Sequence, residues 1–249
     1  MTRILTLNPE YWCQHSRWRL NVCPAPCSVY MRFDKVQNKT FYLIAVGETD
    51  NITDSIRLDL QRFGGSQGSR PVDDPLRLHV RTAFLSFEQS KQPLMDVRGL
   101  LFEQLDEVDV YTHDQRSKDQ LLVVTKKLHL VSQNADCLIG SADHAISIAR
   151  KMAECCEIIR REASRKEPAP SYDHIRTVIV SIQYTRNWLQ TYKSRKETAM
   201  NLVFNLVTQA DSVTTLTISH DMKRDSASMK AIAFLTMTFL PATAVAVRI

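Results

Sequence analysis

The most regular pattern in the sequence lies between residues 121 and 159, which read LLVVTKKLHLVSQNADCLIGSADHAISIARKMAECCEII. Positions spaced alternately three and four residues apart are all apolar there: Leu121, Val124, Leu128, Val131, Ala135, Leu138, Ala142, Ala145, Ala149, Met152, Cys156 and Ile159. This spacing places one side chain per turn on a single helical face. We therefore predict one long helix, or two with a bend near Gly140-Ser141, packed along its length against a neighbour.

A second, weaker stripe follows the segment SRKEPAP, residues 164–170, whose prolines interrupt helices. Nine of its thirteen positions are apolar: Val178, Ile182, Thr185, Leu189, Tyr192, Lys196, Ala199, Val203, Leu206, Ala210, Val213, Thr217 and His220. A single helix from Asp173 to Leu240 would be roughly 100 Å long, at about 1.5 Å per residue. That is long for a compact domain of 249 residues, and a break near Tyr192–Lys196, where the stripe becomes basic, would shorten it.

The N-terminal third has a different character. Two runs rich in β-branched and aromatic residues, Ser28–Phe33 and Thr40–Val46, predict strands. The amphipathic stretch Ile52–Phe63 favours a short helix ending at Gly64-Gly65. The pattern becomes helical from Val80, with a first helix expected between Leu94 and Val110.

The expected fold class is therefore α+β, mostly α. A small N-terminal α/β part precedes long antiparallel helices and a very long C-terminal stalk helix that runs into a short apolar segment. We divide the chain into an N-terminal part, a long-helix layer, a stalk and the apolar segment, at residues 1–80, 81–167, 171–230 and 231–247.

Composition excludes several classes of protein. The chain has 249 residues, 44% of them hydrophobic, and a net charge of +5, which is typical of a folded protein with a mixed surface and no nucleic-acid partner. Its six cysteines show no framework spacing, and the polar opening MTRILTLNPE does not resemble a secretory signal, so we expect reduced thiols in the cytosol. The seven histidines have no nucleophile at a known motif spacing, and Gly64-Gly65 lacks the lysine of a phosphate loop. We expect no enzyme.

The sequence contains only weak motifs for ligand-binding sites. Cys23-Pro-Ala-Pro-Cys27, with His15 nearby, has the spacing of half a zinc site but no second ligand pair, which favours a rigid loop. Carboxylates could hold a divalent cation at a subunit interface or form a solvated acidic face: Asp73, Asp74, Asp106, Glu107 and Asp109. Basic clusters could contact anionic headgroups or form solvated helix surface: Arg160-Arg161, Arg165-Lys166, and Lys193, Arg195 and Lys196.

The C-terminal segment Ala231–Val247, AIAFLTMTFLPATAVAV, has seventeen residues and no charge. A membrane-spanning helix needs about 20 residues, with roughly 17 as the lower limit. The alternatives are a membrane helix, with residues 1–230 on the cytosolic side, and a buried final helix of a soluble bundle. Apolar residues on all faces favour the membrane.

Residues Lys223–Thr243, KRDSASMKAIAFLTMTFLPAT, resemble the entry into the first transmembrane helix of CorA-type magnesium transport proteins, closest to their divergent fungal branch. The matching features are Met229-Lys230, Phe239-Leu240-Pro241 and the threonine two residues after the proline. Weaker similarity lies upstream, at Gln209–Ser212, Gln115–Gln120 and Asp74–His79.

The resemblance implies a cytosolic α/β domain, long antiparallel helices and a stalk helix entering the membrane. It also implies a homopentamer around one pore, with the lipid membrane as partner and Mg²⁺ as the transported or regulatory ion. The pore-lining positions by resemblance are Met229, Ile232, Thr236, Leu240 and Thr243, which the helical period keeps on one face.

The sequence departs from this family in one respect. The resemblance implies a Gly-Met-Asn filter shortly after Thr243 and a second membrane helix, but the 249 residues contain no Gly-Met-Asn. We therefore interpret the chain as a truncated, membrane-anchored CorA-like protein related to divalent cation transport that is not expected to conduct by itself. The codons of Val247-Arg248 could contain the donor site of an intron. Translation would then continue into the unspliced intron and end at a nearby stop codon. The alternative is a non-transporting helical scaffold or interaction protein that keeps the cytosolic body of the family.

Overall fold

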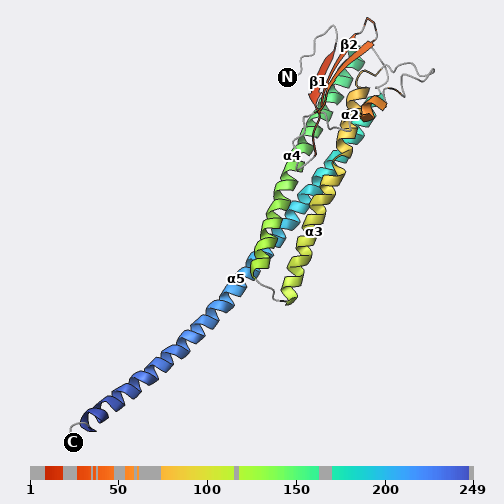
Figure 1. The fold of residues 1–249 in the computed structure, drawn as a ribbon. Helices are drawn as coiled ribbons and strands as arrows, with labels where there is room; N and C mark the ends of the chain where they lie inside the picture. Colours follow the sequence, from red (N-terminus) through yellow and green to blue (C-terminus); the bar gives the residue numbers. More distant parts are fainter. Residues whose placement is uncertain are drawn as a thin grey trace.

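The computed structural model describes residues 9–18, 27–34, 36–37, 39–47, 54–58, 61, 74–114, 118–162 and 170–246. Its strands are β1 (Glu10–Gln14), β2 (Ser28–Asp34) and β3 (Lys39–Ala45). Its long helices are α2 (Arg77–Glu88), α3 (Lys91–Asp114), α4 (Lys118–Glu162) and α5 (Pro170–Ala246), and residues 54–58 are also helical. The fold is α+β and mostly α, as the sequence predicts, with the sheet at one end of an elongated helical body (Figure 1).

The strands form one antiparallel sheet in the order β1-β2-β3. The predicted strands at Ser28–Phe33 and Thr40–Val46 are confirmed as β2 and β3, whereas β1 was not predicted. Alternate residues of β1 and β2 point into the core, so that Tyr11, Cys13, Val29 and Met31 are all buried. The sheet therefore has one buried face, which covers the upper end of the helices (Figure 1).

The twelve-position stripe is the buried face of α4. Eleven of its residues are buried and Ala145 is half-buried. The helix continues without a break through Gly140, where an added Cβ would meet nothing within 4 Å. The prediction of a single long helix is confirmed, and the bend considered at Gly140-Ser141 is not present.

Helices α4 and α5 lie antiparallel, as predicted, and cross-helix ion pairs mark their register. Arg186 Nε lies 2.5 Å from Asp143 Oδ1, and Lys193 Nζ lies 2.8 Å from Asp136 Oδ1. Higher numbers on α5 thus face lower numbers on α4. These pairs are largely exposed and contribute little to stability, so the apolar seam between the helices holds them together.

The very long C-terminal helix is present, and the break considered near Tyr192–Lys196 is not, because α5 is one helix of 77 residues. Lys196 is buried at a stripe position, yet its Nζ reaches Glu197 Oε1 at 2.8 Å. A lysine can bury its alkyl stem while its ammonium group stays paired near the surface. Arg195 points elsewhere, with its guanidinium carbon 5.6 Å from the centre of the Phe102 ring. The basic residues therefore interrupt the hydrophobic pattern but not the helix.

Helix α5 extends well past the ends of α3 and α4 (Figure 1). Its stripe is buried as far as Val203, and every residue from 211 to 237 is exposed. The boundaries that we placed after residues 80 and 230 from the sequence do not coincide with ends of helices, because they fall inside α2 and α5. The expected helix at Ile52–Phe63 is helical at residues 54–58 and 61, and the rest of it lies outside the described residues.

Candidate functional site

The residues placed in a pore by resemblance lie on the projecting part of α5. Met229 and Ile232 are 70% and 62% exposed, and Thr236 is exposed next to them. The Thr236 hydroxyl donates to the Ile232 carbonyl of its own helix, at 2.7 Å. Leu240 and Thr243 continue this face within α5, and their side chains lie outside the described part of the structure. Within the described chain, no other element covers the Met229, Ile232 and Thr236 positions.

The stalk segment between this face and the bundle is unusually neutral. Residues 203–220 contain a single charged residue, Asp211. Hydroxyl groups in this segment donate to carbonyls four residues earlier at 2.9–3.1 Å: those of Thr208, Ser212, Thr214, Thr215 and Thr217. A hydroxyl that donates a hydrogen bond to a carbonyl of its own helix keeps that bond when water is excluded, so it can be buried in a helix interface. This part of α5 is therefore suited to burial against other helices.

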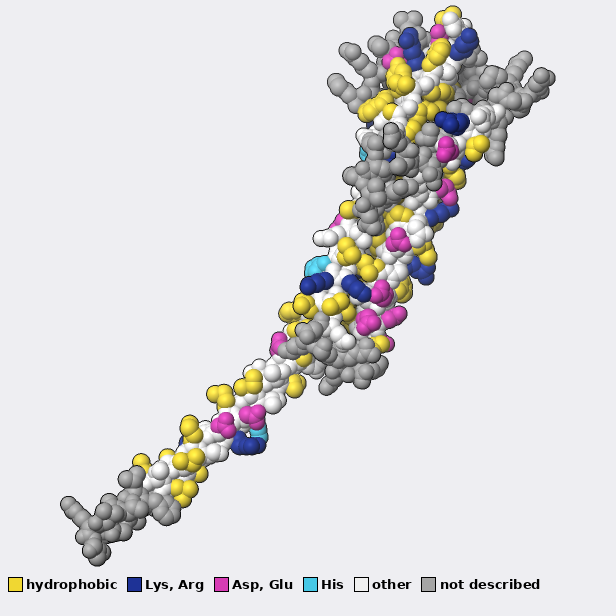
Figure 2. Space-filling view, in the orientation of Figure 1, with side chains coloured by type: hydrophobic (Ala, Val, Ile, Leu, Met, Phe, Trp, Pro, Cys, Tyr) yellow, Lys and Arg dark blue, Asp and Glu magenta, His cyan; other side chains and the backbone are white. Residues whose placement is uncertain are grey.

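A charged belt follows the neutral segment. Acidic and basic side chains lie together on the middle of the projecting helix (Figure 2). The charged residues in this part of the sequence are Asp221, Lys223, Arg224, Asp225 and Lys230. The uncharged segment Ala231–Val247 begins directly after it. Among the described residues, no helix reaches both the length and the hydropathy of a bilayer span.

A second candidate site lies between the sheet and α2. Cys13 and His15, two residues apart, point to the same face as β1 ends, where the His15 amide donates to the Cys27 carbonyl at 2.7 Å. His79, in the first turn of α2, faces them. Cys13 Sγ lies 3.4 Å from His15 Nε2 and 3.4 Å from His79 Nδ1. The three ligand atoms all lie within 4.8 Å of one another, an arrangement that can hold a metal ion.

The surroundings of these groups are apolar. Cys13, His15 and His79 are 6%, 3% and 0% exposed, and the rings of Tyr11 and His79 pack in a T-shaped arrangement with 4.9 Å between centroids. Burial lowers the pKa of His15 to about 4 and that of His79 to about 3, with smaller contributions from His144 and His15 respectively. Burial also raises the pKa of the Cys13 thiol to about 12. Both imidazoles are therefore neutral at physiological pH, and each has a nitrogen lone pair available as a metal ligand.

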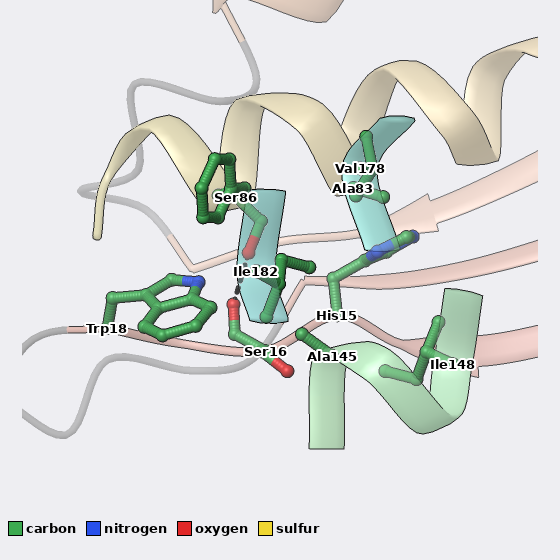
Figure 3. A pocket seen from close by; sticks show the side chains of 10 residues that line it. His15, Ser16, Trp18, Ala83, Ser86, Ala145, Ile148, Val178 and Ile182 are labelled. Carbon is green, nitrogen blue, oxygen red and sulfur yellow. Dashed lines mark hydrogen bonds between the residues drawn. The ribbon is translucent and has the colours of Figure 1, made fainter. Parts of the chain in front are cut away.

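A small cavity opens beside His15, between the residues that follow β1 and helices α2, α4 and α5. Figure 3 shows His15, Ser16 and Trp18 lining it together with Ser86 of α2, Ala145 and Ile148 of α4 and Ile182 of α5. The Ser86 hydroxyl donates to the Ser16 carbonyl, but Ser16 Oγ and Trp18 Nε1 have no hydrogen-bond partner among the described residues. Polar atoms of this kind commonly bind a buried water molecule.

The cysteine pair considered from the sequence lies only partly within the described residues. Cys23 lies outside the described residues, and Cys27 is buried with Val29, Ile56 and Leu78 in a separate apolar cluster. Sequence reasoning noted His15 but missed Cys13 and His79. The spacing of Cys13 and His15 was a usable signal once a strand was assigned there. His79 is 64 residues further along the chain from His15, and its proximity depends on how α2 packs.

The acidic residues also fall in different places. Asp106, Glu107 and Asp109 lie on the exposed face of α3, whereas Asp74 is buried at the start of α2. Its Oδ1 accepts a hydrogen bond from the Leu76 amide at 3.2 Å, and its Oδ2 accepts one from the Ser171 amide at 2.9 Å. Asp74 therefore joins the N-terminal ends of two helices and has a structural role. Asp73 lies outside the described residues.

Most of the basic clusters have partners on the helices. Arg160 and Arg161 both pair with Glu157, at 2.6 and 3.1 Å, which lowers the pKa of that carboxyl group to about 2. Lys193 and Lys196 pair with Asp136 and Glu197, and Arg165-Lys166 lies outside the described residues.

Comparison of the sequence with protein-family models and with the curated proteins finds no match.

Proposed function

We propose that this chain is a subunit of a membrane-anchored, CorA-like homo-oligomer related to divalent cation transport, with Mg²⁺ as the ion. In this proposal residues 1–230 lie on the cytosolic side and α5 forms the central stalk. The observation that carries the proposal is the 27-residue stretch of α5 from 211 to 237, in which every residue is exposed.

An isolated helix of this length is difficult to maintain in water, because most helical stability in proteins comes from packing of an apolar face. Large apolar side chains are nevertheless exposed along it, with Val213 at 60%, Leu216 at 71% and Met222 at 67%. The apolar stripe of the bundle continues into this stretch through Leu206, Ala210 and Val213. Covering it requires a further helix with the same pattern, and a second copy of α5 provides one.

The order of segments along α5 also supports a membrane-entering stalk. A neutral, hydroxyl-rich segment, a charged belt and an uncharged segment follow one another from residue 203 to residue 247. Charged residues at a membrane boundary stay in contact with water and headgroups, while uncharged residues enter the hydrocarbon. The resemblance of Lys223–Thr243 to CorA-type proteins falls on the last two of these segments.

A second candidate function, a non-transporting scaffold, is favoured by an exposed row on the bundle itself. Val180, Tyr184 and Trp188 lie one helical turn apart on α5 and are 50%, 67% and 52% exposed. Tyrosine and tryptophan are enriched in protein interfaces. This row can bind a partner protein whether or not the stalk surrounds a pore.

Ion transport distinguishes the two candidates. A chimaera in which residues 1–243 are followed by the Gly-Met-Asn filter and second membrane helix of a CorA-type transporter is expected to restore growth of magnesium-uptake-deficient cells. The physical reason is that the Met229, Ile232 and Thr236 face would then line a complete pore.

The matched variants of this chimaera are Thr236→Phe and Thr238→Phe. These positions lie about 160° apart around the helix, at 3.6 residues per turn. Phenylalanine at position 236 is expected to block uptake, whereas phenylalanine at position 238 points away from the pore and leaves growth intact. Failure of the chimaera to rescue growth while it is present in the membrane would favour the scaffold.

A further inference from the structure

We propose that Cys13, His15 and His79 form a binding site for a single Zn²⁺ ion that fastens the N-terminal sheet to α2. The inference does not depend on the transport proposal, because these residues lie at the opposite end of the molecule from the projecting part of α5. A thiolate and two imidazoles are also poor ligands for Mg²⁺, which prefers an octahedron of oxygen atoms.

The geometry of the three groups fits a tetrahedral ion. Zinc–sulfur bonds of about 2.3 Å and zinc–nitrogen bonds of about 2.0–2.1 Å place sulfur and nitrogen roughly 3.5 Å apart across a tetrahedral edge. The two measured sulfur–nitrogen distances, from Cys13 to His15 and from Cys13 to His79, are both 3.4 Å. The two imidazole nitrogens lie within 4.8 Å of each other, against about 3.3 Å across a tetrahedral edge, so side-chain rotation would bring the three atoms around a common centre.

Hydrogen bonding alone accounts poorly for this cluster. A thiol carries one proton and can donate it to only one of the two imidazoles, so the other contact relies on sulfur as a weak acceptor. His79 is fully buried, and it faces Cys13 through its Nδ1 atom. Burying a weakly bonded contact is costly, whereas a metal ion would engage Cys13 Sγ, His15 Nε2 and His79 Nδ1 together.

Binding requires one proton to leave. Cys13 would lose its thiol proton to solvent as the zinc–sulfur bond forms, and the two neutral imidazoles would each donate a lone pair. No fourth histidine, cysteine or carboxylate joins the cluster among the described residues. A water molecule would complete the tetrahedron. The ion would connect the β1 end of the sheet to α2.

Metal binding by the full-length chain tests the proposal. Reduced protein freed of metal with a chelator is mixed with Zn²⁺ in the presence of excess Mg²⁺, and bound metal is measured by elemental mass spectrometry. We expect one Zn²⁺ per chain and a raised thermal unfolding midpoint. With Co²⁺ in place of Zn²⁺, we expect a thiolate-to-cobalt charge-transfer band in the near ultraviolet and the intense visible bands of a tetrahedral ion.

Two variants and two matched controls locate the site. Cys13→Ser and His79→Gln are expected to weaken Zn²⁺ binding by more than about 100-fold, above the range for outer-shell changes. Cys156→Ala removes another buried thiol of the same apolar cluster, and His129→Gln removes an exposed histidine of α4; both are expected to bind as the wild type does.

Three results would overturn the proposal: no metal retained by the wild type, an octahedral cobalt spectrum, or binding unaffected by Cys13→Ser and His79→Gln. If either variant fails to fold, the wild-type cobalt spectrum and retention of binding by Cys156→Ala still decide the matter.

Discussion

Replacing Leu128 with alanine is expected to lower the free energy of unfolding by about 2–5 kcal/mol. Leu128 is fully buried at the centre of the apolar stripe of α4, within the core cluster that includes Val97 of α3 and Leu189 of α5. The shorter side chain loses the transfer free energy of the removed methyl groups and leaves a cavity between three helices. Urea unfolding followed by circular dichroism measures the loss.

Leu130 provides the matched control, because it lies two residues away on α4 and is 46% exposed. Leu130→Ala is expected to change the free energy of unfolding by no more than about 0.5 kcal/mol, as is usual for surface positions. Equal losses for Leu128→Ala and Leu130→Ala would contradict the assignment of the buried face.

The Asp74→Ala substitution is expected to cost about 2–4 kcal/mol, because hydrogen bonds to charged groups contribute about 1.5–3 kcal/mol each. The Asp74 carboxylate is the acceptor for two amides that are 95 residues apart, those of Leu76 and Ser171. Both amides belong to helix N-terminal ends, where a negative charge is favourable. Alanine leaves both buried donors without an acceptor. Asp74→Asn retains one carbonyl oxygen and is expected to fall between the wild type and Asp74→Ala.

Asp34 makes the same kind of contact in an accessible turn. Its Oδ1 accepts hydrogen bonds from the Val36 and Gln37 amides at 2.9 and 3.1 Å. Water can replace the carboxylate there, so Asp34→Ala is expected to cost less than about 1 kcal/mol. A loss for Asp74→Ala no larger than that for Asp34→Ala, in the same urea experiment, would show that Asp74 does not join the two helices.

The parts of the fold that could be predicted from sequence are those in which one pattern extends over many residues. The α4 stripe repeats through eleven steps, and the runs at β2 and β3 combine β-branched and aromatic residues, so local spacing alone determined these elements. Strand β1 is only five residues long, and its residues EYWCQ mix apolar and polar side chains. Its pairing with β2 depends on tertiary contacts, and the strand propensities of its residues do not reveal these contacts.

The helix break considered at Lys196 and the cation site considered at Asp74 are absent from the described structure for a common physical reason. A charged residue at an apolar position suggested a broken helix, and an acidic residue near other acids suggested a cation site. The carboxylate of Asp74 is satisfied by the amide of Ser171, which is distant in the sequence. The flexible side chain of Lys196 lets its ammonium group reach Glu197. The Cys13, His15 and His79 cluster was missed for a related reason, since it forms only when α2 packs against the sheet.

The central claim, that copies of α5 cover one another along the projecting stalk, is tested most directly by site-specific photo-crosslinking. A benzophenone amino acid replaces Thr217 or, in parallel, Thr215 in the full-length chain, and the membrane fraction of the expressing cells is irradiated. Both threonines are exposed and bond to their own helix, but they lie about 160° apart around it. Thr217 continues the apolar stripe, so covalent dimers are expected from position 217 and few from position 215. Equal yields from the two positions, or monomer alone from position 217, would contradict the account.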